Sequence, residues 1–520
     1  MRTQRLLLCA LLSLLACSCS TVGPHAPADE SPSQYFQRAI AGLQRTDPGS
    51  PALLNVRLAY GDYLLGAAPG PCAQRVVLAQ EQLGSAAASP KARALYPGGW
   101  ASAADLEYRI QLARATCGGT HEDALLAAVA AANRAAEAYR RAFDYRAMVI
   151  MQFNAAVALH RLGQDAAAIR ALESALDMDR EYGFADDARD NYRLLLRWRG
   201  QPADAAQVAR LMQDFPKRRA TLKYGWHVTD ARITLEERRD CLEDGGIVRS
   251  RGTATYVRHI IASPSGGWSV SYTNRLTGYE PGVWPLKPGS HPPELFFPPL
   301  RLPATDFNVS AAGEFEGVAH SKAFSDRLTA RTNVIIKAGA PAGAAGKSAL
   351  SDALDAAANA LSPGMLEAET TETYELETAM WIGARLEQGV WYQLSAPLAL
   401  PGLSGIVLQQ RVEFAFTRRV PCATGEAEPR CVEIVMRATP DEKAVRSLLA
   451  DINSPLPIPQ FRNYQASLLA RLVVDPTTLL PYAREERVYW YASFGREAKD
   501  TMLESDHLVS TASYPAPAAP

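Results

Sequence analysis

The chain has little of what marks a metal centre, a transmembrane protein or a nucleic-acid-binding protein. Its 8 cysteines and 8 histidines include no Cys-x-x-Cys pair and no two histidines at helical spacing, which argues against a metal site. After the first sixteen residues, no apolar run approaches the roughly 20 residues that span a bilayer. Lys and Arg total 54 and Asp and Glu total 55, so the net charge of −1 offers no basic surface for nucleic acid.

The signatures of common enzyme families are also missing. Residues 402–405 (GLSG) lack the spacing of a Gly-x-Ser-x-Gly nucleophile turn. Residues 346–348 (GKS) follow a Gly-rich turn, but Pro341 stands where a phosphate-binding loop needs its first glycine N–H. His259 lies in a strand-like segment and is interpreted as a hydrogen-bonded sheet residue. We therefore expect no enzyme activity and no cofactor, and keep as an alternative a hydrolase whose carboxylate pair comes from distant positions.

The first sixteen residues have the pattern of a signal peptide. Arg2 and Arg5 precede the apolar run Leu6–Ala16, which is too short to span a bilayer. The segment LLAC that ends at Cys17 resembles the bacterial lipobox, in which the cysteine thiol is diacylglycerylated before cleavage ahead of it. Leu15 is larger than the residue usual at its place.

The resemblance implies a lipoprotein attached to a membrane lipid layer through an acylated Cys17, with Cys19 as the alternative anchor. Ser18 follows Cys17, and in lipoproteins of this kind a residue other than Asp there implies the outer membrane, with the chain facing the periplasm. Several acyl chains anchor a protein stably without a transmembrane helix. Residues 17–33 are rich in Ser, Pro and Ala, which predicts a flexible tether.

Five cysteines follow the signal and anchor region, and an exported protein is expected to use them in disulfides. Cys422 and Cys431 flank the polar stretch ATGEAEPR between two strand-like segments, so we predict that they form a disulfide at the base of a hairpin loop. Cys72 and Cys117 each lie at the edge of a helical segment and are a second candidate pair. Cys241 is left over.

Residues 34–220 have the pattern of a helical domain, with apolar residues recurring at three and four and short Gly, Pro or Asp breaks. Residues 153–179 resemble a tetratricopeptide repeat, and residues 192–216 form a weaker copy. Gly163 of the first copy corresponds to Gly200 of the second, which is a spacing of 37 residues. The family repeats about every 34 residues. The predicted packing positions are Leu159, Leu162, Gly163, Ala168, Leu172 and Ala175, followed by Gly200 and Ala205 in the second copy.

Helix pairs of this kind stack into a superhelix with a concave groove that usually binds peptides or partner proteins. The alternative is that the helices only pack on the rest of the chain.

Residues 221–499 predict a curved antiparallel sheet with a few helices, and residues 500–520 a polar tail rich in Pro and Ala. Period-two alternation or enrichment in β-branched and aromatic residues runs through many segments, for example 373–383, 407–420, 431–438 and 487–494. Helical insertions are expected at 347–367 and 441–452. The glutamates of residues 367–377, among them Glu377, are interpreted as a solvated face. The fold class expected for the whole chain is therefore α+β and multidomain, with all-α repeats first.

The β-rich region resembles lipoprotein domains of unknown function built on a half-barrel, like that of periplasmic lipoprotein carriers. The resemblance rests on residues 362–383 (SPGMLEAETTETYELETAMWIG), the Gly-turn strand pair that follows, and residues 472–491 (LVVDPTTLLPYAREERVYWY). In the carriers the half-barrel holds acyl chains between sheet and helices, so the resemblance implies binding of an apolar ligand. The alternative is a sheet whose apolar face is fully packed by its own helices.

Binding to another envelope protein through the helical repeats is the function that the sequence favours most. Carriage of a lipid or other apolar ligand by the β-rich domain is the first alternative, and the hydrolase is the second.

Overall fold

The computed structural model describes residues 30–87, 97–117, 121–216, 218–243, 246–264, 266–280, 306–326, 329–330, 333, 362–400, 407–423, 425–452, 461–494 and 500–515. Backbone contacts divide the chain into two compact units, and neither is continuous in sequence. The first, here called the helical unit, comprises Met1–Lys217, Arg446–Tyr464 and Tyr491–Leu503. The second, the sheet unit, comprises Arg218–Val445, Gln465–Trp490 and Glu504–Pro520. The fold class is α+β, as predicted.

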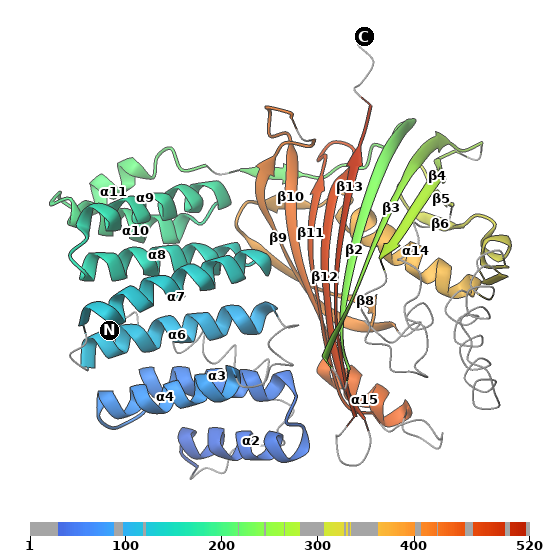
Figure 1. Cartoon of the computed structure of the whole chain (residues 1–520). Helices are drawn as coiled ribbons and strands as arrows, with labels where there is room; N and C mark the ends of the chain where they lie inside the picture. The colour runs from blue at the N-terminus through green and yellow to red at the C-terminus, as the bar shows by residue number, and fades with distance from the viewer. Residues whose placement is uncertain are drawn as a thin grey trace. The chain divides into compact units, whose positions relative to one another are not determined.

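The helical unit is a stack in which each helix packs on the next (Figure 1). Its helices are α2 (Pro32–Thr46), α3 (Pro51–Gly66), α4 (Cys72–Ala87), α6 (Pro97–Cys117), α7 (His121–Arg141), α8 (Tyr145–Arg161), α9 (Asp165–Tyr182), α10 (Ala185–Trp198) and α11 (Ala205–Leu211). Alanine fills much of the contact between α7 and its neighbours, with Ala128, Ala131 and Ala132 all fully buried. Such small side chains let helix axes approach closely.

Local sequence sets where these helices begin and end. Ser31 and Ser50 accept hydrogen bonds from the backbone N–H three residues on, and a proline follows each of them at the start of α2 and α3. Asp144 caps α8 in the same way. At the other end, α9 stops at Gly183, whose φ of 83° is in the left-handed region that favours glycine.

The sheet is antiparallel, with the strand order β6-β5-β4-β3-β2-β13-β12-β11-β10-β9-β8, and a separate pair joins β1 to β7. The strands are β1 (Arg219–Thr221), β2 (Thr229–Glu243), β3 (Gly246–Ala262), β4 (Trp268–Glu280), β5 (Phe307–Val309), β6 (Phe315–Val318), β7 (Arg385–Glu387), β8 (Trp391–Ala399), β9 (Val407–Val420), β10 (Cys431–Pro440), β11 (Phe461–Val474), β12 (Pro481–Phe494) and β13 (Asp500–Ser513). The last three strands contribute residues to both units.

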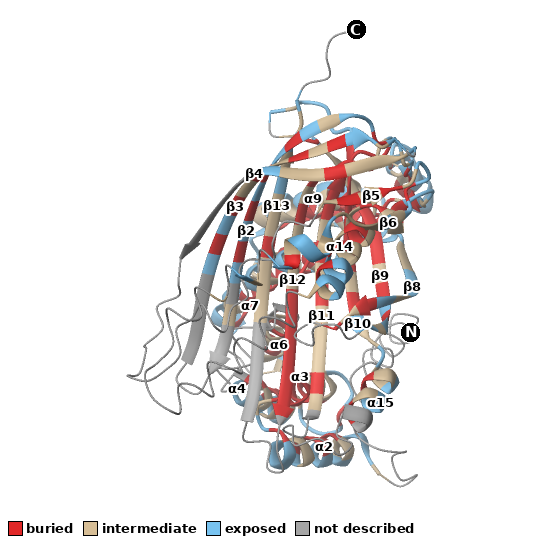
Figure 2. Ribbon diagram, turned by 90° about the vertical axis from the view of Figure 1, so that its right-hand side faces the viewer, coloured by how far each residue is buried: buried red, intermediate tan, exposed pale blue. Residues whose placement is uncertain are grey.

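Helix α14 (Pro363–Glu377) lies across one face of the sheet, and Figures 1 and 2 show it from two directions. The short 3-10 turn η2 (Ala379–Trp381) follows it. Leu376 and Trp381 pack on Val412 and Phe416 of β9 in one hydrophobic core, so the space between α14 and β9–β12 is filled by side chains. Helix α15 (Glu442–Ile452) follows β10.

Four expectations about this region meet different outcomes. Strand β9 and helix α15 lie where the sequence predicts them. The predicted strand at 373–383 is wrong, because α14 runs on to Glu377 and buries Leu366, Thr370 and Tyr374 at intervals of four, which is helical spacing. The predicted tail at 500–520 is also wrong over 500–513, which form β13 between β2 and β12.

Several predicted features lie outside the described residues: the signal peptide, Cys17, most of the tether, and residues 341–361 with the Gly-rich turn. Within the described parts of the chain, no helix is both long and apolar enough to cross a membrane.

Candidate functional site

The tetratricopeptide-like positions of the first copy behave as packing residues. Ala168, Leu172 and Ala175 are fully buried on α9. Gly163, in the turn between α8 and α9, has a φ of 74°, and Gly200 has a φ of 66° after α10, so both glycines serve left-handed turns. Leu159 and Leu162 are half-buried, and Leu162 packs beside Leu125.

The second copy departs from the prediction at Ala205. This residue is exposed, and Val208, three residues further on, is the buried residue of α11. The reason is local: Asp204 caps the helix by accepting a hydrogen bond from the N–H of Gln207 at 2.8 Å, which makes Ala205 the first helical residue of a helix of only 7 residues. A residue at that place does not sit against the preceding helix.

Both predicted disulfides are present. Cys72 and Cys117 join the start of α4 to the end of α6, with Cα atoms 5.8 Å apart, and Cys422 and Cys431 join the ends of β9 and β10, with Cα atoms 5.0 Å apart. The side chain of Cys241 lies outside the described part of the chain.

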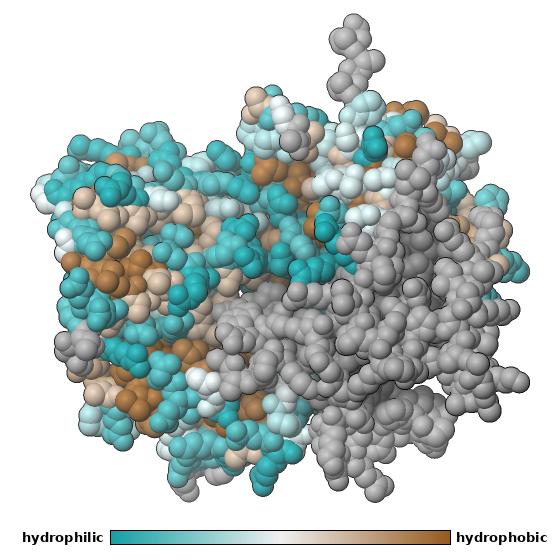
Figure 3. Space-filling model, in the orientation of Figure 1, coloured by the Kyte–Doolittle hydropathy of each residue, from teal (hydrophilic) through white to brown (hydrophobic). Residues whose placement is uncertain are grey.

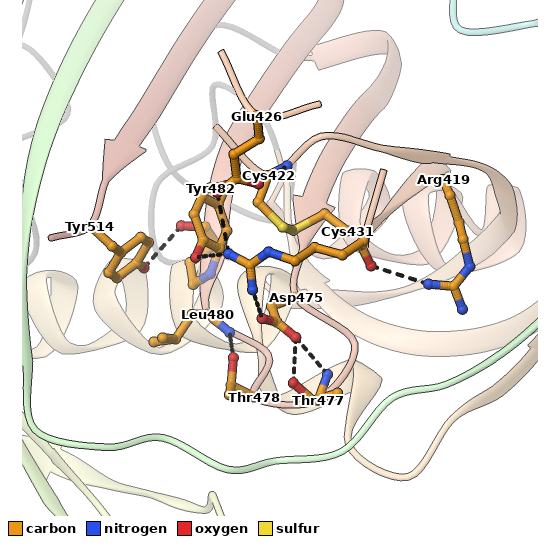
Figure 4. Close-up of a disulfide and its surroundings, with 12 residues drawn as sticks. Arg419, Cys422, Glu426, Cys431, Asp475, Thr477, Thr478, Leu480, Tyr482 and Tyr514 are labelled. Atoms are coloured by element: carbon orange, nitrogen blue, oxygen red, sulfur yellow. Dashed lines mark hydrogen bonds and ion pairs between the residues drawn. A yellow bond between two sulfur atoms is a disulfide. The ribbon is translucent and has the colours of Figure 1, made fainter. Parts of the chain in front are cut away.

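The disulfide between β9 and β10 sits in a polar network (Figure 4). Arg430, next to Cys431, donates hydrogen bonds to Asp475 at 2.9 Å and to the hydroxyl of Tyr482 at 3.1 Å. Asp475 also accepts from the N–H of Thr477 in the turn between β11 and β12. These contacts fix the ends of four neighbouring strands together.

His259 is a hydrogen-bonded sheet residue, as the sequence predicts. Its Nδ1 lies 2.8 Å from Asp230 on β2, and its Nε2 lies 2.5 Å from the hydroxyl of Thr273 on β4. Asp230 and Thr273 are exposed, so these three residues form a cross-strand row on the surface.

A charged row crosses the helical unit and is the first candidate site. Asp105 and Arg109 on α6 form a bidentate pair at 3.2 and 3.0 Å, and Arg109 also lies 3.4 Å from Asp62 on α3. The side chains of Asp62 and Arg109 are 30% and 40% exposed, so solvent or a partner can reach them. Burial raises the pKa of Asp62 to about 6, opposed by the charge of Arg109.

Further ion pairs link other helices of the same unit. Arg134 on α7 contacts Glu107 on α6 at 2.8 Å, and Arg146 on α8 contacts Asp187 on α10 at 2.7 Å. Figure 3 shows a largely hydrophilic surface over these helices, broken by separate hydrophobic patches. The stack therefore offers charged side chains over several consecutive helices.

A cavity of about 50 Å³ between α14 and the sheet is the second candidate site. The polar side chains that line it include Arg258 of β3, Glu377 of α14 and Arg484 of β12. The apolar side chains that line it include Ile233 of β2 and Tyr256 of β3. The mixture of a few polar groups with apolar walls is typical of small-molecule sites.

The charged side chains that line this cavity belong to a buried ionic cluster. Arg484 donates to Glu377 at 3.1 Å and to Glu486 on its own strand by a close hydrogen bond. Arg258 donates to the hydroxyl of Tyr514, which in turn donates to the carbonyl of Pro481 at 3.0 Å. Burial raises the pKa of Tyr514 to about 12, so its hydroxyl is neutral at physiological pH.

Ile233 and Tyr256 also belong to a larger group of buried core side chains, here called the β2–β3–β13 patch. It begins at Ile233 and Tyr256 beside the cavity and continues along the same face of the strands. Its buried members are Ala231, Ile233, Leu235, Ala254, Tyr256 and Leu508.

Sequence reasoning missed the cavity. Glu377 was expected on a solvated face, and this is wrong, because its side chain is only 17% exposed and lies beside two arginines. The available signal is weak. Arg258 lies between Tyr256 and Ile260 on the same face of its strand, and Arg484 follows Tyr482 on the same face of β12, positions where strand alternation favours an apolar residue.

Comparisons with known proteins add little. No protein-family model matches the chain, and no curated protein does either. Among solved structures, the chain is similar to lipovitellin, in a structure that concerns lipid–protein interactions in lipovitellin, with 10% identity and a TM-score of 0.29. The match covers 57% of this chain and 26% of the lipovitellin chain. A similarity at this level carries no argument about fold or function.

Proposed function

We propose that this protein is a membrane-anchored lipoprotein of the bacterial envelope whose helical unit binds a partner protein. The observation that carries the proposal is the charged row of Asp62, Asp105 and Arg109. These side chains are partly exposed and lie on α3 and α6, two helices that pack on each other. Stacked helix hairpins use such extended surfaces to bind peptides and proteins. The signal-peptide pattern and the lipobox resemblance at Cys17 support the location.

The charges of the row suggest what the partner carries. Two carboxylates surround one guanidinium, so the row has an excess of one negative charge when Asp62 is ionised. A lysine or arginine of a partner would complete the pairing and favour the ionised form of Asp62. Because the pKa of Asp62 is about 6, such binding should strengthen as the pH rises through that value.

The test is affinity purification of the full lipidated chain from gently solubilised membranes, with Asp62→Asn plus Asp105→Asn as the test variant. Glu236→Gln on β2 is the matched control, since Glu236 is an exposed carboxylate that also pairs with an arginine, Arg251. We expect a stoichiometric partner with the wild type and the control, and its loss with the test variant. Equal recovery with all three proteins, or no stoichiometric partner, would contradict the proposal.

A second candidate function is binding of an apolar ligand by the sheet unit. The observation in its favour is the cavity of about 50 Å³ between α14 and the sheet, whose lining combines polar and apolar side chains. The filled core between α14 and β9–β12 limits this function to the other part of the sheet. Native mass spectrometry of the purified protein tests it, with a co-purifying small molecule as the expected result.

A further inference from the structure

Three side chains on neighbouring strands form a chain of hydrogen bonds. Asp230 of β2 lies 2.8 Å from Nδ1 of His259 on β3, and Nε2 of His259 lies 2.5 Å from the hydroxyl of Thr273 on β4. A carboxylate oxygen only accepts hydrogen bonds, so Nδ1 carries the proton of the neutral imidazole. Nε2 is then the acceptor, and the hydroxyl of Thr273 donates to it.

The strand pairing explains why these side chains meet. β2, β3 and β4 lie side by side in the sheet (Figure 1). Asp230 is opposite His259, and Thr273 is opposite Val257, two residues from His259 on the same face of β3. Directly opposite and diagonal neighbours on one face of a sheet are close enough for their side chains to interact.

The backbone of β4 is irregular directly after Thr273. From the pair Val257–Thr273 to the pair Thr255–Leu276, β3 advances by two residues and β4 by three, so β4 carries a β-bulge. Bulges redirect side chains and are over-represented next to active sites.

A small molecule in solvent can reach all three groups. The side chains of His259 and Asp230 are 27% and 62% exposed, and Thr273 is exposed. The hydrogen bond from Nδ1 to Asp230 sets the tautomer of the ring, so that Nε2 is free of a proton where it meets Thr273. Carboxylate, imidazole and hydroxyl in this order make up an activated nucleophile.

We infer that Thr273 is a nucleophile for acyl transfer from an ester, with His259 as its general base and Asp230 as the residue that positions His259. Thr273 Oγ1 forms a bond to the acyl carbon, and the bond from that carbon to the leaving oxygen breaks. The hydroxyl proton of Thr273 passes to Nε2 of His259 and then to the leaving oxygen. Water hydrolyses the acyl-threonine by the same route and releases a carboxylic acid. The inference goes beyond the binding functions proposed above.

The exposure of the site sets the class of substrate. An exposed site excludes little water, so it gives the tetrahedral intermediate little of the electrostatic stabilisation found in enclosed sites. We therefore expect reaction with activated acyl esters, whose leaving group departs readily, such as aryl esters.

The experiment treats the full chain with p-nitrophenyl acetate at pH 8 and locates the acetyl group by peptide mass spectrometry. We expect acetylation of Thr273 together with an initial burst of p-nitrophenolate. Thr273→Val should remove the burst, whereas Thr273→Ser, which keeps a hydroxyl, should retain it. His259→Gln should slow acetylation of Thr273 at least about tenfold, since general-base catalysis contributes roughly 10²–10⁴-fold.

The positioning role of Asp230 is tested by rescue. Asp230→Ala should slow acetylation of Thr273, and Asp230→Glu should restore part of the rate, which a change in folding alone would not do. The controls are Thr253→Val, at another exposed threonine of β3, and His227→Gln, at an exposed histidine. Both should keep the burst and the acetylation of Thr273.

Three results would overturn the inference. The first is acetylation elsewhere with none at Thr273. The second is an undiminished burst in Thr273→Val, which would make another group the nucleophile. The third is an unchanged rate in His259→Gln, which would remove the general base. Melting temperatures of all variants establish that each is folded.

Discussion

The hydroxyl of Tyr491 donates a hydrogen bond to the buried carboxylate of Asp47, 444 residues away in sequence. Asp47 lies between α2 and α3, is 5% exposed, and also accepts from Asn463 at 3.1 Å and Ser493 at 3.5 Å. Burial raises the pKa of Asp47, while these three donors oppose the rise. All four residues belong to the helical unit, so its first loop is tied to segments from the end of the chain.

Removing the hydroxyl with Tyr491→Phe should destabilise the helical unit by about 1–3 kcal/mol, because a buried acceptor loses its closest donor. The variant should also raise the pKa of Asp47 further. A raised carboxyl pKa contributes stability at low pH that is lost as the pH rises through the folded-state value. The loss should therefore be larger at pH 8 than at pH 4.5, as measured by urea denaturation at both pH values.

Tyr60→Phe is the matched control for this substitution. The hydroxyl of Tyr60 on α3 accepts a hydrogen bond from the neutral amide of Gln37 at 3.3 Å. Its removal should cost less, about 0.5–1.5 kcal/mol, and the cost should not change with pH. A pH-independent loss in Tyr491→Phe would show that Asp47 does not titrate in response.

Asp179 on α9 provides a second pH-dependent prediction. It is fully buried, accepts from the amide of Asn191 at 2.7 Å, and burial raises its pKa from 3.8 to about 7. The wild type should therefore lose stability as the pH rises from about 4 to above 7. Asp179→Asn removes this titration, so its stability relative to wild type should improve by about 1–3 kcal/mol between pH 4 and pH 8. Thermal melts between pH 4 and pH 8 test this change in stability. Asp190→Asn, which changes an exposed carboxylate, is the control.

Much of the fold could be predicted from the sequence because it depends on local patterns. Val412, Phe414 and Phe416 lie on one face of β9 while Glu413, Ala415 and Thr417 lie on the other, and residues 441–452 carry the helical spacing of α15. Residues 373–377 were mistaken for a strand because β-branched and aromatic side chains such as Thr373 and Tyr374 favour strands locally. The core between α14 and the sheet, which reaches Leu376, outweighs that preference.

The candidate site in the sheet unit could not be predicted, because it depends on strand order. Arg258 and Arg484 are 226 positions apart in sequence and meet only because β13 and β2 lie between β12 and β3. The prediction treated residues 500–520 as a tail, which left out β13 and with it Tyr514, the partner of Arg258. No periodicity within a single segment carries that information.

The two disulfides should contribute unequally to stability. Cys72 and Cys117 are separated by 45 residues, whereas Cys422 and Cys431 are separated by 9. If each acts by restricting the unfolded chain, the longer loop gives about 4 kcal/mol and the shorter about 2.5 kcal/mol. We expect Cys72→Ala plus Cys117→Ala to lower the free energy of unfolding more than Cys422→Ala plus Cys431→Ala. The reverse order in urea denaturation would point to lost packing around Cys422 instead.

The membrane anchor is tested by metabolic labelling with a palmitate analogue. The lipobox resemblance predicts that Cys17→Ala abolishes both labelling and cleavage of the signal peptide, while Cys19→Ala leaves both intact. Unchanged labelling of Cys17→Ala, with loss in Cys19→Ala, would move the anchor to Cys19. Labelling of neither the wild type nor the variants would remove the lipoprotein assignment altogether.

Ala168 and Ala205 occupy the same place in the two repeat copies, yet the structure gives them opposite environments. Ala168 is fully buried between helices, whereas Ala205 is exposed at the start of α11. Ala168→Val should therefore overpack the helix contact and cost about 1–3 kcal/mol. Ala205→Val should cost less than about 0.5 kcal/mol, since it changes only helix propensity at a first-turn position. Because both changes add the same side chain, a similar loss in the two variants would mean that α11 packs as a full second helix of the repeat.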